Sequence, residues 1–217
     1  SVSRKGHRFV SLNEEIYTQS ELLSENRAEK IGKTLVFLET VGSTNDYLKN
    51  IAMDQKDGMV VISDAQTSGK GRLGRAWDSE SGSGIWMSVL LKPDIEPAEA
   101  PKITQIAAAA MTLAIEKVTQ AKIDIKWPND LILNKKKVCG VLTEMSAELG
   151  GINYVIVGIG VNVNQTDFPE ELKGKATSLN LELVEKQSRK DIVLSFFEYF
   201  EELYNDFIQN ESLNKTI

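Results

Sequence analysis

The sequence predicts an α+β domain in which a mixed, largely antiparallel sheet has helices packed on one face. Short apolar segments typical of strands follow one another with only turn-forming residues between them. Two longer segments, 98–118 and 189–207, show the i, i+3, i+4 apolar spacing of amphipathic helices. Because a doubly wound parallel sheet needs a helix after nearly every strand, this order favours strands joined by hairpins.

The first 33 residues carry only weak structural signals. Residues 8–12 alternate apolar and polar side chains, as a short half-exposed strand would. Residues 13–33 are polar, with a weak helical pattern near 20–24. We therefore expect a linker or edge segment here, followed by one globular domain over residues 34–217.

Regular elements fill most of the remaining chain. Ser43 and Thr44 offer hydroxyl groups that can cap a helix over about 45–53. Turn-forming residues at 134–136 and 149–151 predict two hairpins. The predicted strands are residues 34–38, 59–62, 85–91, 123–126, 131–133, 138–145 and 154–163.

The composition argues against several classes of function. The chain has 217 residues and a net charge of −6, and an acidic domain binds nucleic acid poorly because affinity for phosphate backbones depends on lysine and arginine. A single cysteine, Cys139, excludes an internal disulfide framework and indicates a reducing compartment, so we expect a cytoplasmic protein. A single histidine, His7, leaves little scope for a histidine metal site or a Ser-His-Asp triad. No apolar run approaches the roughly 20 residues that cross a bilayer, so no membrane partner is expected.

A glycine-rich loop from Gln66 to Gly84 is the most informative stretch. Its G-x-G-x-x-G match at Gly69, Gly71 and Gly74 suggests a dinucleotide fold. That motif requires a helix directly after the glycines, and polar loop residues follow here instead. The match therefore does not indicate a dinucleotide site.

The same loop places the cations Lys70, Arg72 and Arg75 between glycines. Glycine lets backbone N–H groups approach an anion, and arginine offers a planar fork that suits phosphate or carboxylate. Trp77 ends the cationic segment with a flat face that can stack on a purine. The alternative is a solvated basic hairpin with Trp77 as a core anchor.

A second polar group lies where a predicted strand ends. Pro128 stops ladder pairing, so Asn129 and Asp130 project from a tight turn, although such a sequence is also typical of an ordinary turn. Lys137 opens the next strand, where alternation can turn it inward; the alternative is a solvated turn of lysines. Glycines inside the strands that follow mark close approach of a ligand or a bulge, and they are Gly140, Gly158 and Gly160.

Taken in order, these segments resemble the biotin–protein ligase family over about residues 34–207. The matching elements are Ser43-Thr44-Asn45, Gln66 with the loop through Trp77, Lys126-Trp127-Pro128-Asn129-Asp130, Lys137 with Gly140, and Gly158 to Asn162. The resemblance implies the biotinyl/lipoyl ligase fold, which is similar to class II synthetases. It also implies an enzyme that uses ATP and Mg²⁺ to adenylate biotin and then transfers biotin to a lysine of a carrier protein.

The resemblance further implies a role for each site residue. Catalysis would rest on Lys137, Arg72 and Asp130. Biotin would be bound by Ser43, Thr44, Asn45, Gln66, Lys70, Gly71, Arg72, Lys137, Gly140, Leu142 and Gly158. ATP or the adenylate would be bound by Arg72, Arg75, Trp77, Lys126, Asn129 and Asn162. No direct metal ligand is implied, and Mg²⁺ is expected on the ATP phosphates. The family often has arginine where this chain has Lys70, which keeps the charge but loses the bidentate fork.

Partners and flanking domains are implied as well. The acceptor would be a biotin carboxyl carrier protein, such as the biotin domain of acetyl-CoA carboxylase, and a ligand-dependent homodimer is expected. Residues 6–12 resemble the last strand of a winged-helix wing, so 1–33 are expected to be a remnant of that domain plus a linker. DNA would be bound only through the missing N-terminal part, with which the parent protein would repress biotin-synthesis genes. The small C-terminal β-barrel of the family is expected to be absent.

Two other functions fit parts of this pattern. A lipoate or octanoyl protein ligase has a related fold, but the loop 66–77 and the segment 126–130 favour biotin. A non-catalytic biotin-sensing repressor core would bind the ligand without chemistry. The presence of Lys137, Arg72 and Asp130 favours retained catalysis.

Overall fold

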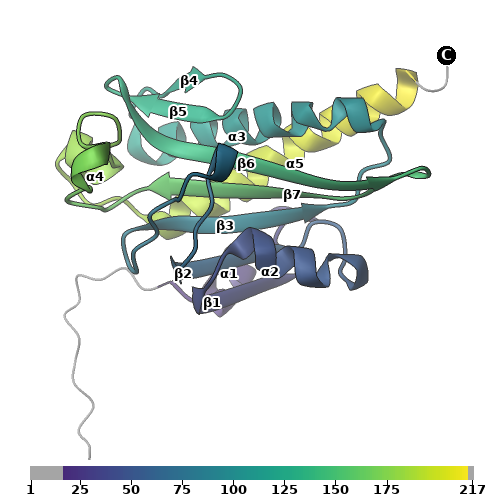
Figure 1. Ribbon diagram of the computed structural model, residues 1–217, viewed down its shortest axis with the longest axis horizontal. Helices are drawn as coiled ribbons and strands as arrows, with labels where there is room; N and C mark the ends of the chain where they lie inside the picture. Colours follow the sequence, from purple (N-terminus) through teal and green to yellow (C-terminus); the bar gives the residue numbers. More distant parts are fainter. Residues whose placement is uncertain (1–16, 215–217) are drawn as a thin grey trace, which may run out of the picture.

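A computed structural model describes residues 17–214, and their side chains as far as residue 210. Its centre is a seven-stranded sheet in the order β1-β2-β3-β7-β6-β5-β4 (Figure 1). The strands are β1 Leu35–Val41, β2 Val60–Gln66, β3 Gly84–Leu91, β4 Asp124–Lys126, β5 Asp130–Leu133, β6 Lys136–Glu148 and β7 Gly151–Asn162. Only β1 and β2 pair in parallel; the other neighbouring strands are antiparallel. The prediction of a mixed, largely antiparallel sheet is confirmed.

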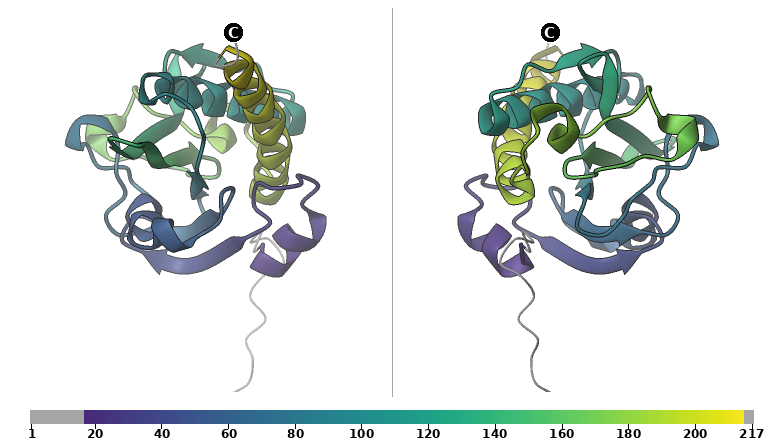
Figure 2. Two further views of the ribbon diagram at one scale, coloured as in Figure 1. Left: turned by 90° about the vertical axis from the view of Figure 1, so that its right-hand side faces the viewer. Right: turned by 90° about the vertical axis from the view of Figure 1, so that its left-hand side faces the viewer.

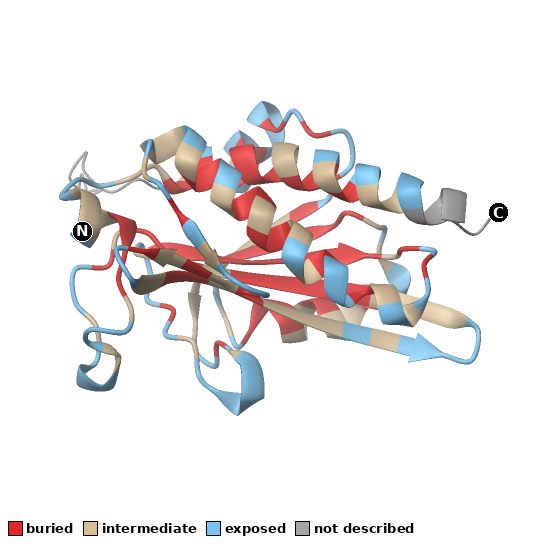
Figure 3. Cartoon of the chain, turned by 90° about the horizontal axis from the view of Figure 1, so that it is seen from above, coloured by how far each residue is buried: buried red, intermediate tan, exposed pale blue. Residues whose placement is uncertain are grey.

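Two long helices, α3 Pro101–Thr119 and α5 Arg189–Asn214, lie side by side over one face of the sheet (Figure 3). The alternate residues of the central strands that point to this face form one large apolar core with them. Phe196 and Phe200 of α5 are fully buried there, with ring centroids 5.1 Å apart. Burying a phenylalanine side chain stabilises a fold by roughly 1.5–3 kcal/mol, so α5 is a main anchor of the domain.

A third helix, α2 Thr44–Ile51, packs on the opposite face. Leu48 of α2 contacts a smaller apolar cluster that includes Val61 and Leu90, which point away from the main core. The expectation that helices pack on one face is therefore correct for the two long helices and wrong for α2. The reason lies in β2 and β3, which are apolar on both faces, so that one face near α2 also needs a cover.

The described part of the N-terminal stretch packs on this domain and is not a free linker. Figure 2 shows helix α1 Gln19–Glu25 at the N-terminal end of the described chain. The helix has a capping box between Thr18 and Glu21 and buries Leu22 completely. The carboxylate of Glu201 on α5 accepts hydrogen bonds from the backbone N–H groups of residues 29–31. The described residues before residue 34 therefore contribute to the same apolar core as the rest of the chain. The strand expected at 8–12 lies outside the described residues.

Short elements complete the fold. The sequence patterns did not predict helix α4 Leu179–Leu183 or the 3-10 turns Ala52–Asp54, Arg72–Gly74, Pro97–Glu99 and Glu170–Leu172. Asn134 and Lys135 adopt positive φ angles of 49° and 68°, which builds the tight hairpin turn that the sequence predicted between β5 and β6. This hairpin pairs the start of β6 with β5, and the candidate site begins at this pair of strands.

Candidate functional site

A cavity of about 440 Å³ lies on the sheet face opposite α3 and α5. Its walls come from the start of α2, the loop after β2, one face of β6 and β7, and the segment 165–176 that follows β7. Pockets of this size hold small molecules in many proteins. These segments lie far apart in the sequence, and only the sheet brings them together.

The cavity contains nearly every residue that the sequence analysis selected. Lys126 is the exception: it ends β4, is exposed and does not line the cavity. The selected residues that do line it are Ser43, Thr44, Asn45, Gln66, Lys70, Gly71, Arg72, Arg75, Trp77, Asn129, Asp130, Lys137, Gly140, Leu142, Gly158 and Asn162.

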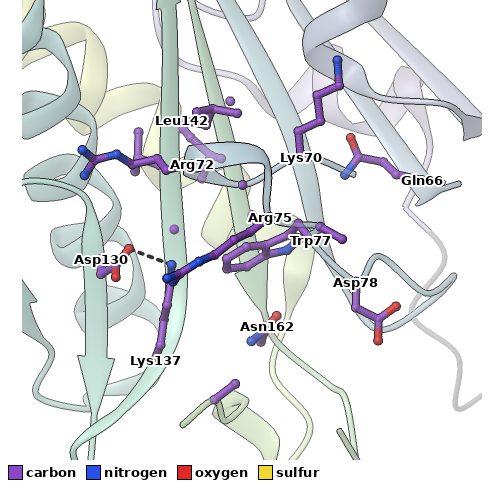
Figure 4. A pocket seen from close by; sticks show the side chains of 18 of the residues that line it. Gln66, Lys70, Arg72, Arg75, Trp77, Asp78, Asp130, Lys137, Leu142 and Asn162 are labelled. Carbon is purple, nitrogen blue, oxygen red and sulfur yellow. Dashed lines mark ion pairs between the residues drawn. The ribbon is translucent and has the colours of Figure 1, made fainter. Parts of the chain in front are cut away.

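One side of the cavity is a cationic wall, which we define as Arg72, Asn129, Asp130 and Lys137. Lys137 Nζ lies 2.7 Å from Asp130 Oδ1 (Figure 4), and Arg72 Nη1 donates to Asn129 Oδ1 at 2.7 Å. The Asn129 amide also donates to Asp130 Oδ1 at 3.1 Å. Two cations from separate segments are thus joined through one Asn-Asp pair.

The backbone around Lys137 explains why its side chain faces the cavity. The N–H of Lys137 donates to the carbonyl of Lys175, and its carbonyl accepts from Thr177 N–H, both at 2.9 Å. The segment 175–177 therefore extends the ladder at this end of β6 and covers the strand edge. With both backbone groups satisfied there, Lys137 is not part of a solvated turn, and about 32% of its side chain is exposed.

Lys70 does not join this wall. Its ammonium group lies 2.6 Å from Asp46 Oδ2 in the first turn of α2, and Figure 4 shows its side chain directed away from Lys137. The hydrogen bond to Asp46 raises the pKa of Lys70. In this structure Lys70 pairs with Asp46, while its expected role in binding biotin stays a prediction.

The indole of Trp77 lies on two of the glycines. A Cβ atom on Gly140 would lie 2.8 Å from Trp77 Cζ3, and one on Gly160 would lie 2.5 Å from Trp77 Nε1. Lys137 Nζ lies 5.0 Å from the centroid of the ring, within the range of a cation–π contact. The glycines thus make room for a side chain of the loop and also line the cavity, so close approach of a ligand there stays a prediction.

Opposite the wall is a polar floor, which we define as Thr44, Asn45 and Gln66, which line the cavity, together with Ser79 and Ser88, which support them from behind. Gln66 Oε1 accepts from Thr44 N–H at 2.9 Å, and its Nε2 donates to Ser79 Oγ at 2.9 Å. Ser88 Oγ lies 2.7 Å from Thr44 Oγ1 and 2.5 Å from Asn45 Oδ1. A side chain on Gly158 would collide with Asn45, so this glycine too is required by a neighbouring side chain.

The start of α2 positions this floor. Ser43 is its N-cap, with Oγ accepting from Asp46 N–H at 3.5 Å, as the sequence predicted. The cap fixes the first turn of the helix, so Thr44 and Asn45 point toward the cavity and are almost completely buried. Neutral hydroxyl and amide groups held in this way can bind a ligand that has both N–H donors and a carbonyl acceptor.

Sequence reasoning missed several residues of the site. Ser88 is a polar residue in an otherwise apolar strand, and that contrast was a usable signal. Ser79 is a buried residue in a loop of similar small polar residues, so its sequence context could not single it out. The segment 165–176 has no periodicity, yet Asp167, Phe168 and Lys175 line the cavity.

The fold and this site define a domain whose cavity joins a neutral polar region to a cationic one. Residues 37–162 match the model of the Biotin/lipoate A/B protein ligase family, and the chain belongs to this family. The sequence is 40% identical over 211 residues to the bifunctional ligase/repressor BirA of Bacillus spizizenii, a match that covers 96% of this chain and 65% of that protein. The chain therefore spans less than two thirds of this relative.

Two further relatives support the same family. A biotin–[acetyl-CoA-carboxylase] ligase of Mycobacterium tuberculosis is 35% identical over 144 residues, which is 64% of this chain and 52% of that protein. The solved structure of the biotin protein ligase from Aquifex aeolicus in complex with biotin and ATP superposes with a TM-score of 0.73 at 35% identity, covering 82% of this chain and 72% of that one.

Among residues 17–214, no helix is both long and apolar enough to span a membrane.

Proposed function

We propose that this protein uses ATP to convert biotin to biotinyl-5′-adenylate and then transfers the biotinyl group to a lysine of a carrier protein. The observation that carries the proposal is the division of one cavity into a neutral polar floor and a cationic wall. Biotin has a neutral ureido ring at one end and a carboxylate at the other. The floor suits the ring, and the wall suits the carboxylate together with the α-phosphate of ATP.

The charges of the wall match the difficulty of the first step. The biotin carboxylate attacks the α-phosphorus of ATP, forms a mixed anhydride and releases pyrophosphate, so two anionic groups must meet. Lys137 and Arg72 offset this repulsion and stabilise the charge that develops in the transition state. Mg²⁺ would come to the site on the ATP phosphates and supply further positive charge.

Asp130 and Asn129 act here as holders of the two cations. The Asp130 carboxylate fixes Lys137, and the side-chain oxygen of Asn129 fixes Nη1 of Arg72. In this assignment Trp77, Arg75 and Asn162 contact the adenylate. The loop that carries Arg72 and Trp77 also keeps water from the mixed anhydride until a carrier amine attacks it.

The acceptor and the assembly form part of the same proposal. The acceptor is the biotin domain of a carboxylase carrier protein, and the enzyme forms a homodimer when its ligand is bound. The protein acts in the cytoplasm, and any binding of DNA would require a domain other than the one described. The similarity to proteins named ligase/repressor supports a role of the parent protein in transcription.

The family to which the chain belongs includes lipoate ligases, so lipoate is the main competing substrate. The dithiolane ring of lipoate has no N–H or carbonyl group, and it would leave the polar floor without partners. The floor therefore favours biotin. A repressor core without catalysis is the second alternative, and the two cations of the wall argue against it.

A direct assay separates these possibilities. The purified protein is incubated with ATP, Mg²⁺ and either biotin or lipoate, and the release of pyrophosphate and the formation of the acyl adenylate are measured. We expect both products with biotin and neither with lipoate. If the adenylate formed with lipoate and not with biotin, biotin would not be the substrate. If biotin bound without release of pyrophosphate, the protein would not be a catalyst.

A further inference from the structure

Glu144 of β6 lies behind the polar floor and does not line the cavity. Its Oε2 accepts a hydrogen bond from Asn45 Nδ2 at 2.7 Å, and its other oxygen pairs with Lys49 of α2. Asn45 and Lys49 lie one turn apart on the helix. A single carboxylate, with about 27% of its side chain exposed, therefore contacts the helix start that forms the floor.

This contact forces the direction of the Asn45 amide. A carboxylate can only accept, so Asn45 must direct its NH₂ group toward Glu144. The same NH₂ group also approaches the carbonyl oxygen of Leu142 at 3.4 Å. Asn45 Oδ1 is left facing Ser88 Oγ at 2.5 Å, where it can only accept.

The hydroxyl groups of the floor follow from that direction. Ser88 has one proton, and Asn45 Oδ1 takes it. The 2.7 Å contact between Ser88 and Thr44 must then be a hydrogen bond that the Thr44 hydroxyl donates. Gln66 Oε1, which accepts from Thr44 N–H, also lies 3.2 Å from Thr44 Oγ1 and could take the Thr44 proton, but Ser88 Oγ at 2.7 Å is the nearer acceptor. The Thr44 oxygen therefore has only lone pairs left to offer the cavity.

We propose that Glu144 is a positioning residue that makes the Thr44 hydroxyl an acceptor for an N–H group of the ligand. The inference rests on the proposed function, in which that N–H belongs to the ureido ring of biotin. Glu144 acts through Asn45 and Ser88, and it does not touch the ligand. If Asn45 could rotate, Ser88 could donate to Thr44, and the Thr44 proton would then be shared between the longer contact to Gln66 Oε1 and orientations that meet the ligand N–H and repel it.

The variant Glu144→Gln tests this directly. A glutamine amide can donate as well as accept, so it no longer fixes Asn45. We expect the dissociation constant for biotin, measured by isothermal titration calorimetry, to rise about tenfold. The matched control is Glu148→Gln, which makes the same change at an exposed site on the same strand and should bind biotin as the wild type does. Thermal unfolding of each variant reports whether the fold is intact.

A double-mutant cycle with Thr44→Val separates positioning from general support. Valine has nearly the shape of threonine but no hydroxyl group, so the chain of hydrogen bonds from Glu144 no longer reaches the ligand. We expect Glu144→Gln to have almost no further effect on biotin binding in the Thr44→Val background. Fully additive losses would show that Glu144 acts by another route and would overturn the proposal.

The variant Lys49→Met tests whether Glu144 merely anchors the helix. Methionine removes the ion pair but leaves the Glu144 carboxylate on Asn45, so we expect biotin affinity within about twofold of the wild type. A loss equal to that of Glu144→Gln would assign the effect to anchoring and overturn the proposal. A wild-type protein that does not bind biotin would overturn the proposed function as well, whereas tight binding by both wild type and Glu144→Gln would overturn only the role of Glu144.

Discussion

The polar floor and the cationic wall are built in different ways although they share one cavity. The floor consists of neutral groups on or beside regular elements, and Thr44, Asn45 and Ser88 are almost completely buried. The wall consists mainly of charged groups partly open to solvent, and Arg72 begins a short 3-10 turn within the long loop after β2. A preformed floor can recognise a ligand by shape and hydrogen bonds, whereas the wall must exchange its internal partners for the anions of the ligand.

This contrast predicts that the wall determines the rate of reaction and the floor determines affinity. The variant Lys137→Ala should reduce pyrophosphate release at least about a thousandfold, because the charge that develops at the α-phosphate loses its main partner. Biotin binding by calorimetry should weaken far less. The neighbouring variant Lys136→Ala is the matched control, because Lys136 pairs with Glu182 and lies outside the cavity. If Lys137→Ala released pyrophosphate at the normal rate, the wall would have no catalytic role.

The variant Arg72→Gly tests whether the loop that carries Arg72 retains the adenylate. Without the guanidinium group the adenylate is still formed but is held less firmly, so activated biotin should escape about a hundredfold more readily. Biotin attached to bystander proteins, detected on a blot after incubation with ATP and biotin, measures this escape. Equal or lower labelling than the wild type, with adenylate still made, would count against a clamp.

The variant Gln66→Leu tests the floor. It leaves the buried N–H of Thr44 without its acceptor, which costs about 1–3 kcal/mol, and it removes one of the two partners of the Ser79 hydroxyl, which still donates to the Trp77 carbonyl. We expect biotin affinity to fall about tenfold to a hundredfold, while the turnover of bound biotin changes little. If Gln66→Leu kept its affinity for biotin but lost turnover, the floor would act on the rate of reaction and not on affinity.

The variant Lys70→Met should have the smallest effect. The ion pair of Lys70 with Asp46 is largely exposed, and such pairs contribute about 0–1 kcal/mol. We expect the midpoint of thermal unfolding to shift by only a few degrees and pyrophosphate release to stay within about threefold of the wild type. A hundredfold loss of activity would show that Lys70 joins the wall during the reaction.

The regular parts of the fold could be predicted from the sequence because their apolar periodicity is strong. Strands β3, β6 and β7 and helix α3 lie within a few residues of their predicted ranges, and α5 begins where it was predicted but runs on to Asn214 instead of ending at residue 207. The position of α2 could not be predicted, since the face that a helix covers depends on the twist and order of the strands. The packing of residues 17–33 was missed for a similar reason: α1, which carries the buried Leu22, packs on both β1 and the distant α5.

The site residues were predicted better than their contacts. Lysine and arginine in glycine-rich segments indicated anion binding, and Arg72 and Lys137 do line one cavity. The partner of Lys70 was not predictable, because Asp46 lies 24 residues away in the sequence and meets it only in the fold. The glycines carried a signal of close approach, but that signal does not distinguish a ligand from the side chain of Trp77.

The seating of Trp77 on Gly140 and Gly160 gives the protein a built-in optical reporter. The other two tryptophans differ in environment: Trp86 is fully buried, and Trp127 is about 57% exposed. A molecule that entered the space above the glycines would lift the Trp77 indole away from the ammonium of Lys137. Emission from a single indole would then change colour and intensity as the cavity fills, so occupancy can be followed in real time without attaching a dye.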